Sequence, residues 1–263
     1  MQYRLIAIDV DGTLLDDEGK LRPRVRRAVR EAAAAGAEIV LCTGRGPVST
    51  LPLMAELGLS GTIITHNGAV ILESESRRIL HEEKIPRRLA APYLNYCRER
   101  GIHFAFNTAF ELYVEKELSR ETLEIYSRYW IRPIVRKEPG PPENTVRLTV
   151  YGSREEIDDM EARWSGWSRG LSVHRSDHKV IDLQHPEATK GSALERLARL
   201  RGLSRREVLA IGNYYNDISM LRYAGRSVAV ANAPAEVRAA AGEVTRSNNE
   251  DGVALVLEEL LRG

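Results

Sequence analysis

Two aspartates, Asp9 and Asp11, stand one residue apart at the end of a short apolar run, Tyr3–Ile8. Burying two like charges together is costly unless a cation or a bound substrate uses them. Gly12 and Thr13 end the strand, so the two carboxylates can diverge around a common metal ion and phosphate group. The spacing is therefore consistent with chemistry on a phosphorylated ligand, although the pair alone is a weak signal.

Two acids allow a division of labour in such chemistry. Asp9 would attack phosphorus and form an aspartyl-phosphate, while Asp11 protonates the leaving oxygen and later activates the hydrolytic water. An aspartate pair of this kind also occurs in solvated turns at strand ends, so the interpretation depends on what the other strand ends carry.

Polar groups follow further strand-like runs. Thr43 comes directly after the run Glu38–Cys42, where its hydroxyl can donate to phosphoryl oxygens, and Arg45 can add a charge-assisted contact. A simple Thr-Gly turn is the alternative.

Lys190 precedes an expected helix, where its ammonium would offset the charge of Asp9 and of a phosphate. A solvated surface lysine is the alternative in that case.

A fourth polar stretch, Gly212–Asp217, follows the apolar run Val208–Ile211. It offers amide and carboxylate oxygens, which are the ligands that magnesium prefers, although an Asx-rich turn would read the same way. Four such clusters in this order are far more specific than any one of them alone.

Together the clusters resemble the four motifs of the haloacid dehalogenase superfamily, and within it the Cof-like branch, whose large α/β cap is inserted between the second and third motifs. The four matching segments are Asp9–Leu15, Thr43–Arg45, Lys190–Gly191 and Gly212–Asp217. The segments typical of the branch are His66–Ala69, Thr189–Gly191, Val228–Ala233 and Glu250–Ala254. Over the inserted part the resemblance rests on position and length alone.

The resemblance implies a magnesium ion held by the Asp9 side chain, the Asp11 backbone carbonyl and Asn213, with Asp217 supporting the site through water. The catalytic residues that it implies are Asp9, Asp11, Thr43 and Lys190, and the substrate-binding residues are Gly44, Arg45, Asn67 and Asn216. The branch usually carries aspartate at the position of Asn213. An amide oxygen still ligates magnesium but brings one negative charge fewer, so we expect weaker metal binding.

The hydrophobic pattern of the elements that must position these residues changes along the chain. Near-continuous apolar runs separated by helical stretches, such as 24–35, predict a parallel sheet that binds ligands at the carboxyl ends of its strands. Between about His81 and Gln184 the apolar residues alternate, as in half-exposed antiparallel strands. We therefore predict an α/β fold: a Rossmannoid parallel-sheet core over 1–81 and 186–263, and an inserted α+β cap over 82–185 that selects the substrate.

The bulk composition excludes several classes of partner. Lys plus Arg (38) nearly balance Asp plus Glu (37), so no global field would recruit nucleic acid or an anionic membrane. Cys42 and Cys97 lack a metal-type or redox-type spacing and are expected to be buried small hydrophobes. With no apolar run of membrane-spanning length and no signal peptide, the chain is expected to be cytoplasmic.

These observations favour a magnesium-dependent phosphatase of small phosphate monoesters, either sugar phosphates or phosphorylated cofactors. One alternative is phosphotransfer of the phosphomannomutase type, and another is a non-catalytic sensor of phosphorylated ligands, which the weakened metal site at Asn213 would suit. In the insertion, Asp182 and His178 are the candidates for substrate selection, whereas Trp130, Trp164 and Trp167 are expected to pack in its interior. The sequence does not indicate an oligomeric state.

Overall fold

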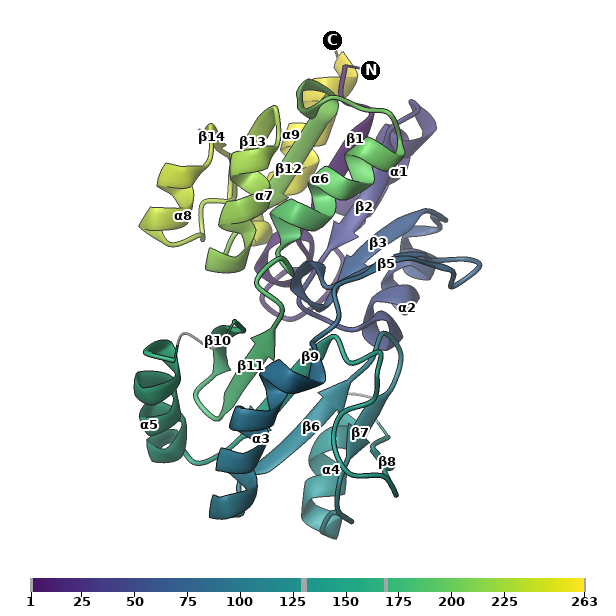
Figure 1. Ribbon diagram of the computed structural model, residues 1–263. Coiled ribbons are helices and arrows are strands. Elements are labelled where there is room, and N and C mark those ends of the chain that lie inside the picture. Colours follow the sequence, from purple (N-terminus) through teal and green to yellow (C-terminus); the bar gives the residue numbers. More distant parts are fainter. Residues whose placement is uncertain (1, 129–131, 168–169, 263) are drawn as a thin grey trace. The chain divides into compact units, whose positions relative to one another are not determined.

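The structure, a computed structural model, describes residues 2–128, 132–167 and 170–262 (Figure 1). The chain divides into two compact units, each with its own sheet and hydrophobic core. The core unit comprises Met1–Gly46, Thr50–His81 and Thr189–Gly263, and the insert unit comprises Pro47–Ser49 and Glu82–Ala188.

The core unit is built on a sheet with the strand order β14-β13-β12-β1-β2-β3-β4-β5. Its central strands are β12 (Val208–Gly212), β1 (Leu5–Ile8), β2 (Glu38–Cys42) and β3 (Thr62–Thr65), and they run parallel. The flanking strands are β13 (Arg226–Ala229), β14 (Glu243–Val244), β4 (Val70–Glu73) and β5 (Ile79–Glu82). Strands buried on both faces have near-continuous apolar sequences, and the predicted α/β class with a parallel-sheet core is confirmed.

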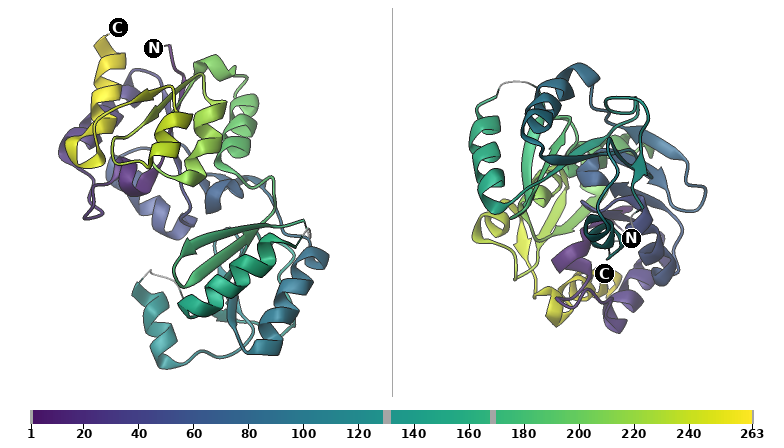
Figure 2. Two further views of the ribbon diagram at one scale, coloured as in Figure 1. Left: turned by 90° about the vertical axis from the view of Figure 1, so that its left-hand side faces the viewer. Right: turned by 90° about the horizontal axis from the view of Figure 1, so that it is seen from below.

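Helices cover both faces of this sheet (Figures 1 and 2). On one face, α6 (Lys190–Leu200), α7 (Ile218–Tyr223) and α8 (Ala235–Ala240) pack on small residues such as Ala7 and Cys42. On the other face, α1 (Pro23–Ala34) and α9 (Gly252–Arg262) pack against each other. The helix α2 (Pro47–Leu57) follows β2. Cys42 is buried in this core, and burial raises the pKa of its thiol, as expected for an inert cysteine.

The insert unit has a sheet of its own with the order β10-β11-β9-β6-β7-β8. Its strands are β6 (His103–Asn107), β7 (Leu112–Val114), β8 (Ile134–Val135), β9 (Arg147–Tyr151), β10 (Ser172–Asp177) and β11 (Val180–Gln184). The antiparallel pairs β6–β9 and β9–β11 account for the alternating sequence pattern, because only one side of each strand enters the main hydrophobic cluster. That side includes Phe104, Phe106, Leu148 and Val150.

Helices α3 (Arg87–Arg100) and α5 (Arg154–Ser165) cover this apolar face, while α4 (Arg120–Arg128) contributes Tyr126 to a smaller cluster on the other face. Trp164 and Trp167 pack on Tyr93 with ring centroids 5.1 and 5.3 Å away, so the predicted interior aromatic packing is confirmed for these two. Trp130 lies outside the described residues. Burial raises the pKa of Cys97, in α3, to about 12.

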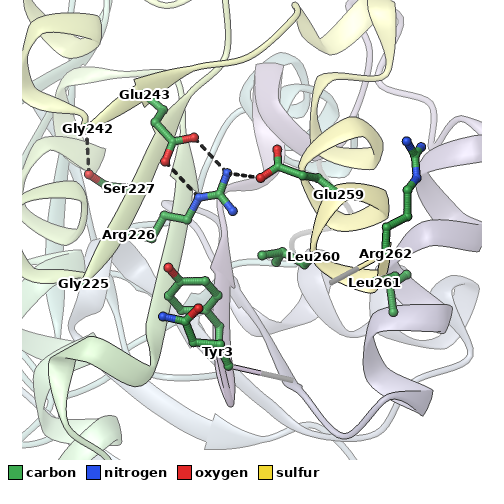
Figure 3. Close-up of a pocket in the computed structure, with 11 residues that line it drawn as sticks. Tyr3, Gly225, Arg226, Ser227, Gly242, Glu243, Glu259, Leu260, Leu261 and Arg262 are labelled. Carbon is green, nitrogen blue, oxygen red and sulfur yellow. Dashed lines mark hydrogen bonds and ion pairs between the residues drawn. The ribbon is translucent and has the colours of Figure 1, made fainter.

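A pocket of about 1110 Å³ lies at the edge of the core unit near the start of β13 (Figure 3). Arg226 is one of the residues that line it, and its guanidinium binds both Glu243, at 2.8 and 3.0 Å, and Glu259, at 3.0 Å. Its lining includes none of the residues predicted to carry chemistry.

Among the residues that the structure describes, no helix is long and apolar enough to cross a bilayer.

Candidate active site

The strand order β12-β1-β2-β3 places the loops that follow these four parallel strands next to one another at one edge of the sheet. Asp9 follows β1, Thr43 follows β2, His66–Gly68 follows β3 and the segment 213–217 follows β12. Carboxyl ends of parallel strands are where open α/β sheets bind ligands. The strand order alone therefore places the first, second and fourth predicted motifs at the same edge of the sheet.

A buried ion triad links the third and fourth motifs to Asp9. The Lys190 ammonium donates to Asp9 Oδ1 at 2.7 Å and to Asp217 Oδ1 at 2.6 Å, and all three side chains are buried. The sequence predicted that Lys190 precedes the helix, but Lys190 is the first residue of α6. The helix begins there because Thr189 caps it by accepting from the Ser192 amide. The helix start thus aims the ammonium at the end of β1.

The charges of this triad do not cancel. Burial raises the pKa of Asp9, and repulsion from Asp217 adds to it, while Lys190 opposes both, so that the pKa stands at about 7. Burial would lower the pKa of Lys190, but the attraction of Asp217 and Asp9 outweighs it and holds that pKa above its usual range. Lys190 is therefore a fixed cation in a site with excess negative charge.

Asp217 organises the fourth motif from within. Its Oδ2 accepts hydrogen bonds from the backbone amides of Asn213, at 2.8 Å, and Tyr214, at 2.9 Å. Asn213 in turn accepts a hydrogen bond at Oδ1 from the Thr13 hydroxyl, at 3.2 Å. Both carboxylate oxygens of Asp217 are thus engaged by protein donors, and its predicted water-mediated support of a metal stays a prediction.

A second cluster joins the second motif to the turn after β3. The Asn67 amide donates to the Thr43 carbonyl at 3.0 Å, and the Asn67 side-chain oxygen accepts from Asn216 Nδ2 at 2.9 Å. Asn67 adopts a left-handed backbone, with φ 56°. A Cβ on Gly44 would lie 2.8 Å from Asn67 Oδ1, so only glycine fits there without displacing the side chain. The structure therefore brings Thr43, Gly44, Asn67 and Asn216 together.

Asp11 has a different partner from the members of the buried triad Lys190, Asp9 and Asp217. Its carboxylate is paired with Arg45, whose Nε lies 2.9 Å from Oδ2 and whose Nη2 lies 2.5 Å from Oδ1. The Asp11 side chain is 59% exposed, whereas Asp9 is buried. Asp11 lies in an irregular turn, Val10–Leu14, so the two carboxylates meet different partners, while their predicted arrangement around a common metal and phosphate stays a prediction.

A family model of the haloacid dehalogenase-like hydrolases matches residues 6–257. The chain belongs to this family. The match runs through the insertion, where the motifs carried no information, so the resemblance is confirmed over the length of the chain.

Relatives of this haloacid dehalogenase-like hydrolase match over nearly their full length. The 5-amino-6-(5-phospho-D-ribitylamino)uracil phosphatase YwtE of Bacillus subtilis is 27% identical over 99% of this chain and 99% of its own. The pyridoxal phosphate phosphatase YbhA of Escherichia coli is 28% identical over 97% of both chains. The crystal structure of TM0651 from Thermotoga maritima is 27% identical and superposes with a TM-score of 0.85, covering 98% of this chain and 97% of its own.

The residues of this family member fit a small, hard cation. The implied donors are the Asp9 carboxylate, the Asp11 carbonyl and the Asn213 amide oxygen, all of them oxygens, as magnesium prefers. Burial and, after it, repulsion from Asp217 raise the pKa of Asp9, and a divalent cation beside Asp9 would favour the charged carboxylate. Among the described residues, no group of three or more His, Cys, Asp and Glu side chains could hold a metal ion, so a cation at this place would also have to use the neutral oxygens of Asn213 and of the Asp11 backbone.

Sequence reasoning gave no role to several residues that shape the site. Thr13 is buried and binds Asn213. Asn232 Nδ2 donates to the Gly12 carbonyl at 2.8 Å, and Asn232 Oδ1 accepts from the Asn248 amide at 3.1 Å. These side chains fix the turn that carries Asp11. Asn232 lies in Val228–Ala233, a segment typical of the Cof-like branch, and this resemblance was the only feature of the sequence that could have pointed to a role for Asn232.

The two candidates for substrate selection lie in different surroundings within the insert unit. Asp182 is buried on β11, where it accepts hydrogen bonds from Thr149, at 2.7 Å, and Ser176, at 2.5 Å. His178 is exposed in the turn between β10 and β11. A selective role for either residue stays a prediction.

Proposed function

We propose that this family member is a magnesium-dependent phosphatase that hydrolyses small phosphate monoesters through an aspartyl-phosphate on Asp9. The observation that carries the proposal is the buried hydrogen bond between Lys190 and Asp9. Holding a carboxylate and an ammonium out of water costs free energy, and buried ionisable groups with shifted pKa values are concentrated at functional sites. Lys190 fixes the carboxylate and offers positive charge where a phosphoryl group would add negative charge.

The reaction would proceed in two steps. In the first, an Asp9 oxygen attacks phosphorus, the bond from phosphorus to the leaving oxygen breaks, and a proton from Asp11 passes to that oxygen. In the second, water attacks phosphorus, its proton passes to Asp11, and the bond between phosphorus and Asp9 breaks. Asp9 returns as carboxylate and Asp11 regains its proton, so both acids are ready for another turnover.

The remaining residues would bind and orient the phosphoryl group. Thr43, the Gly44 amide and Asn67 lie together at the ends of β2 and β3 and can donate to its oxygens. Asn216 holds the Asn67 side chain. A magnesium ion held by Asp9, Asp11 and Asn213 would neutralise phosphoryl charge.

The proposed substrates are sugar phosphates or phosphorylated cofactors. The names of YwtE and YbhA, which match along almost their whole length, support small metabolites of this kind.

Asn213 favours a second candidate, a sensor that binds phosphorylated ligands without turnover, because the amide brings less charge to a metal. The buried Lys190–Asp9 pair argues for catalysis, since binding alone does not need a nucleophile.

A direct test is release of inorganic phosphate from 4-nitrophenyl phosphate and from a panel of phosphorylated metabolites, with magnesium and with excess chelator. We expect magnesium-dependent release, and a loss of at least about 10⁴-fold in Asp9→Asn. Asp158→Asn, an exposed aspartate of the insert unit, is the matched control and should retain activity. Robust turnover by Asp9→Asn would refute the nucleophile. Binding without turnover by the wild type would favour the sensor, and isomerised sugar phosphate without free phosphate would favour phosphotransfer.

A further inference from the structure

We propose that Arg45 is a positioning residue for Asp11: its guanidinium holds the Asp11 carboxylate in the orientation from which it exchanges a proton with the leaving oxygen. The inference rests on the proposed function and adds a role for the second motif. In this arrangement the two aspartates are paired with different cations: Asp9 with Lys190, which Asp217 shares, and Asp11 with Arg45.

The contact is of a kind that fixes orientation. Two hydrogen bonds run side by side, from Arg45 Nε to Asp11 Oδ2 at 2.9 Å and from Arg45 Nη2 to Asp11 Oδ1 at 2.5 Å. A bidentate guanidinium–carboxylate pair sets the plane of the carboxylate as well as its distance. A lysine ammonium at the same place would act as a point charge and leave that plane free.

The backbone of Arg45 is itself held by two hydrogen bonds. Its amide donates to the Thr43 hydroxyl at 3.1 Å, and its carbonyl accepts from the His66 amide at 2.9 Å. Thr43 is buried at the end of β2. The base of the Arg45 side chain is therefore tied to the turn after β3 and to the predicted phosphate-binding loop.

Asp11 needs such support more than Asp9 does. Its backbone lies in the irregular turn, with φ −78° and ψ 119°, and is followed by Gly12 with φ 73°. Its side chain is 59% exposed, and a carboxylate this exposed is free to change rotamer unless a partner holds it. An exposed ion pair adds little to stability, so fixing the carboxylate is the more substantial consequence of this pair.

A leaving-group comparison tests this role. Phenyl phosphate and 4-nitrophenyl phosphate have similar shapes, but phenol is the poorer leaving group and depends more on a proton from Asp11. We expect Arg45→Ala to lower kcat/KM for phenyl phosphate at least about tenfold more than for 4-nitrophenyl phosphate. Arg45→Lys should recover little of this selectivity, and in an Asp11→Asn background Arg45→Ala should no longer change the ratio.

The matched control is Arg78→Ala, because Arg78 makes the same two-bond contact with Glu73, at 3.2 and 2.5 Å, on the surface of the core unit. It should leave both rates unchanged.

An equal loss for both esters in Arg45→Ala would overturn the proposal in favour of a phosphate contact. No loss, or a change of ratio that persists without Asp11, would overturn it as well. If the wild type hydrolyses neither ester, the proposed function fails and this role fails with it. If it hydrolyses both with an unchanged ratio in Arg45→Ala, only this role fails.

Discussion

Lys190 Nζ lies 2.7 Å from Asp9 Oδ1 and 2.6 Å from Asp217 Oδ1, so one ammonium joins the end of β1 to the loop after β12. Asp217 also holds the amides of Asn213 and Tyr214. The proposed nucleophile and the proposed metal-binding loop are therefore positioned by the same two buried side chains. Changes to this pair should affect folding and chemistry together.

Replacing Lys190 by methionine leaves two carboxylates buried without the cation between them. We expect the free energy of unfolding to fall by about 3–5 kcal/mol and phosphate release to be lost. Adding Asp217→Asn should restore part of the stability, because it removes one of the two unpaired charges, but none of the activity. Urea unfolding with and without magnesium measures the first effect.

The control for this pair is Lys179→Met, which changes an exposed lysine of the insert unit. It should unfold at the urea concentration of the wild type. If Lys190→Met also does so, the ammonium is not essential to the buried site.

Asn213→Asp should strengthen magnesium binding, because a carboxylate brings to the cation a charge that the amide lacks. We expect the magnesium concentration that gives half of the maximal thermal stabilisation to fall about tenfold, and Asn213→Ala to raise it. The readout is the melting temperature, so it does not depend on turnover. An unchanged or higher concentration for Asn213→Asp would place the cation elsewhere.

Gly68→Ala should be markedly destabilising. The φ of Gly68 is +100°, and a Cβ there would lie 2.1 Å from the Thr189 carbonyl oxygen, so the turn after β3 and the start of α6 would be forced apart. We expect a loss of at least about 2 kcal/mol in the free energy of unfolding. Gly36→Ala separates the two causes, because Gly36 has φ +98° with nothing within 4 Å of the added Cβ. It should cost only about 1 kcal/mol, and equal losses would show that the close approach is unimportant.

His103 should make the stability of the insert unit depend on pH. Burial lowers the pKa of His103, whose Nε2 lies 2.9 Å from the Tyr126 hydroxyl. Because the folded-state pKa is below the unfolded value of about 6.5, the unfolded chain takes up the proton first as the pH falls. Stability should therefore decline below about pH 6.5 and level off below the folded-state pKa. Urea unfolding should show a weaker decline in His103→Gln, and identical pH profiles would contradict this.

The regular elements of the core could be predicted from the sequence because their patterns are local. The run at Glu38–Cys42 is a strand with the predicted bounds, and the helix expected over 24–35 spans Pro23–Ala34. A strand that is buried on both faces consists of apolar residues, so the polar residues that follow it stand out in the sequence. The candidate site residues could be predicted because they follow such strands.

What the sequence could not provide are contacts across long separations in the chain. The pairing of Arg45 with Asp11, and of Asn216 with Asn67, depends on how loops meet at the sheet edge and on backbone such as the left-handed Asn67. Thr13 and Asn232 were missed because short polar residues in turns look alike until their partners are known. The role of Asp217 as an anchor for amides likewise depends on three-dimensional contacts.

The most direct test of the mechanism is to trap the covalent intermediate. In Asp11→Asn the hydrolytic step lacks its base, while 4-nitrophenyl phosphate still supplies a good leaving group, so phosphorylated protein should accumulate. Acid quenching followed by peptide mass spectrometry should find one added phosphoryl group on Asp9, lost on treatment with hydroxylamine and absent from Asp9→Asn. Phosphate release by the wild type together with an unmodified Asp9 peptide, or a phosphoryl group on another residue, would contradict nucleophilic attack by Asp9.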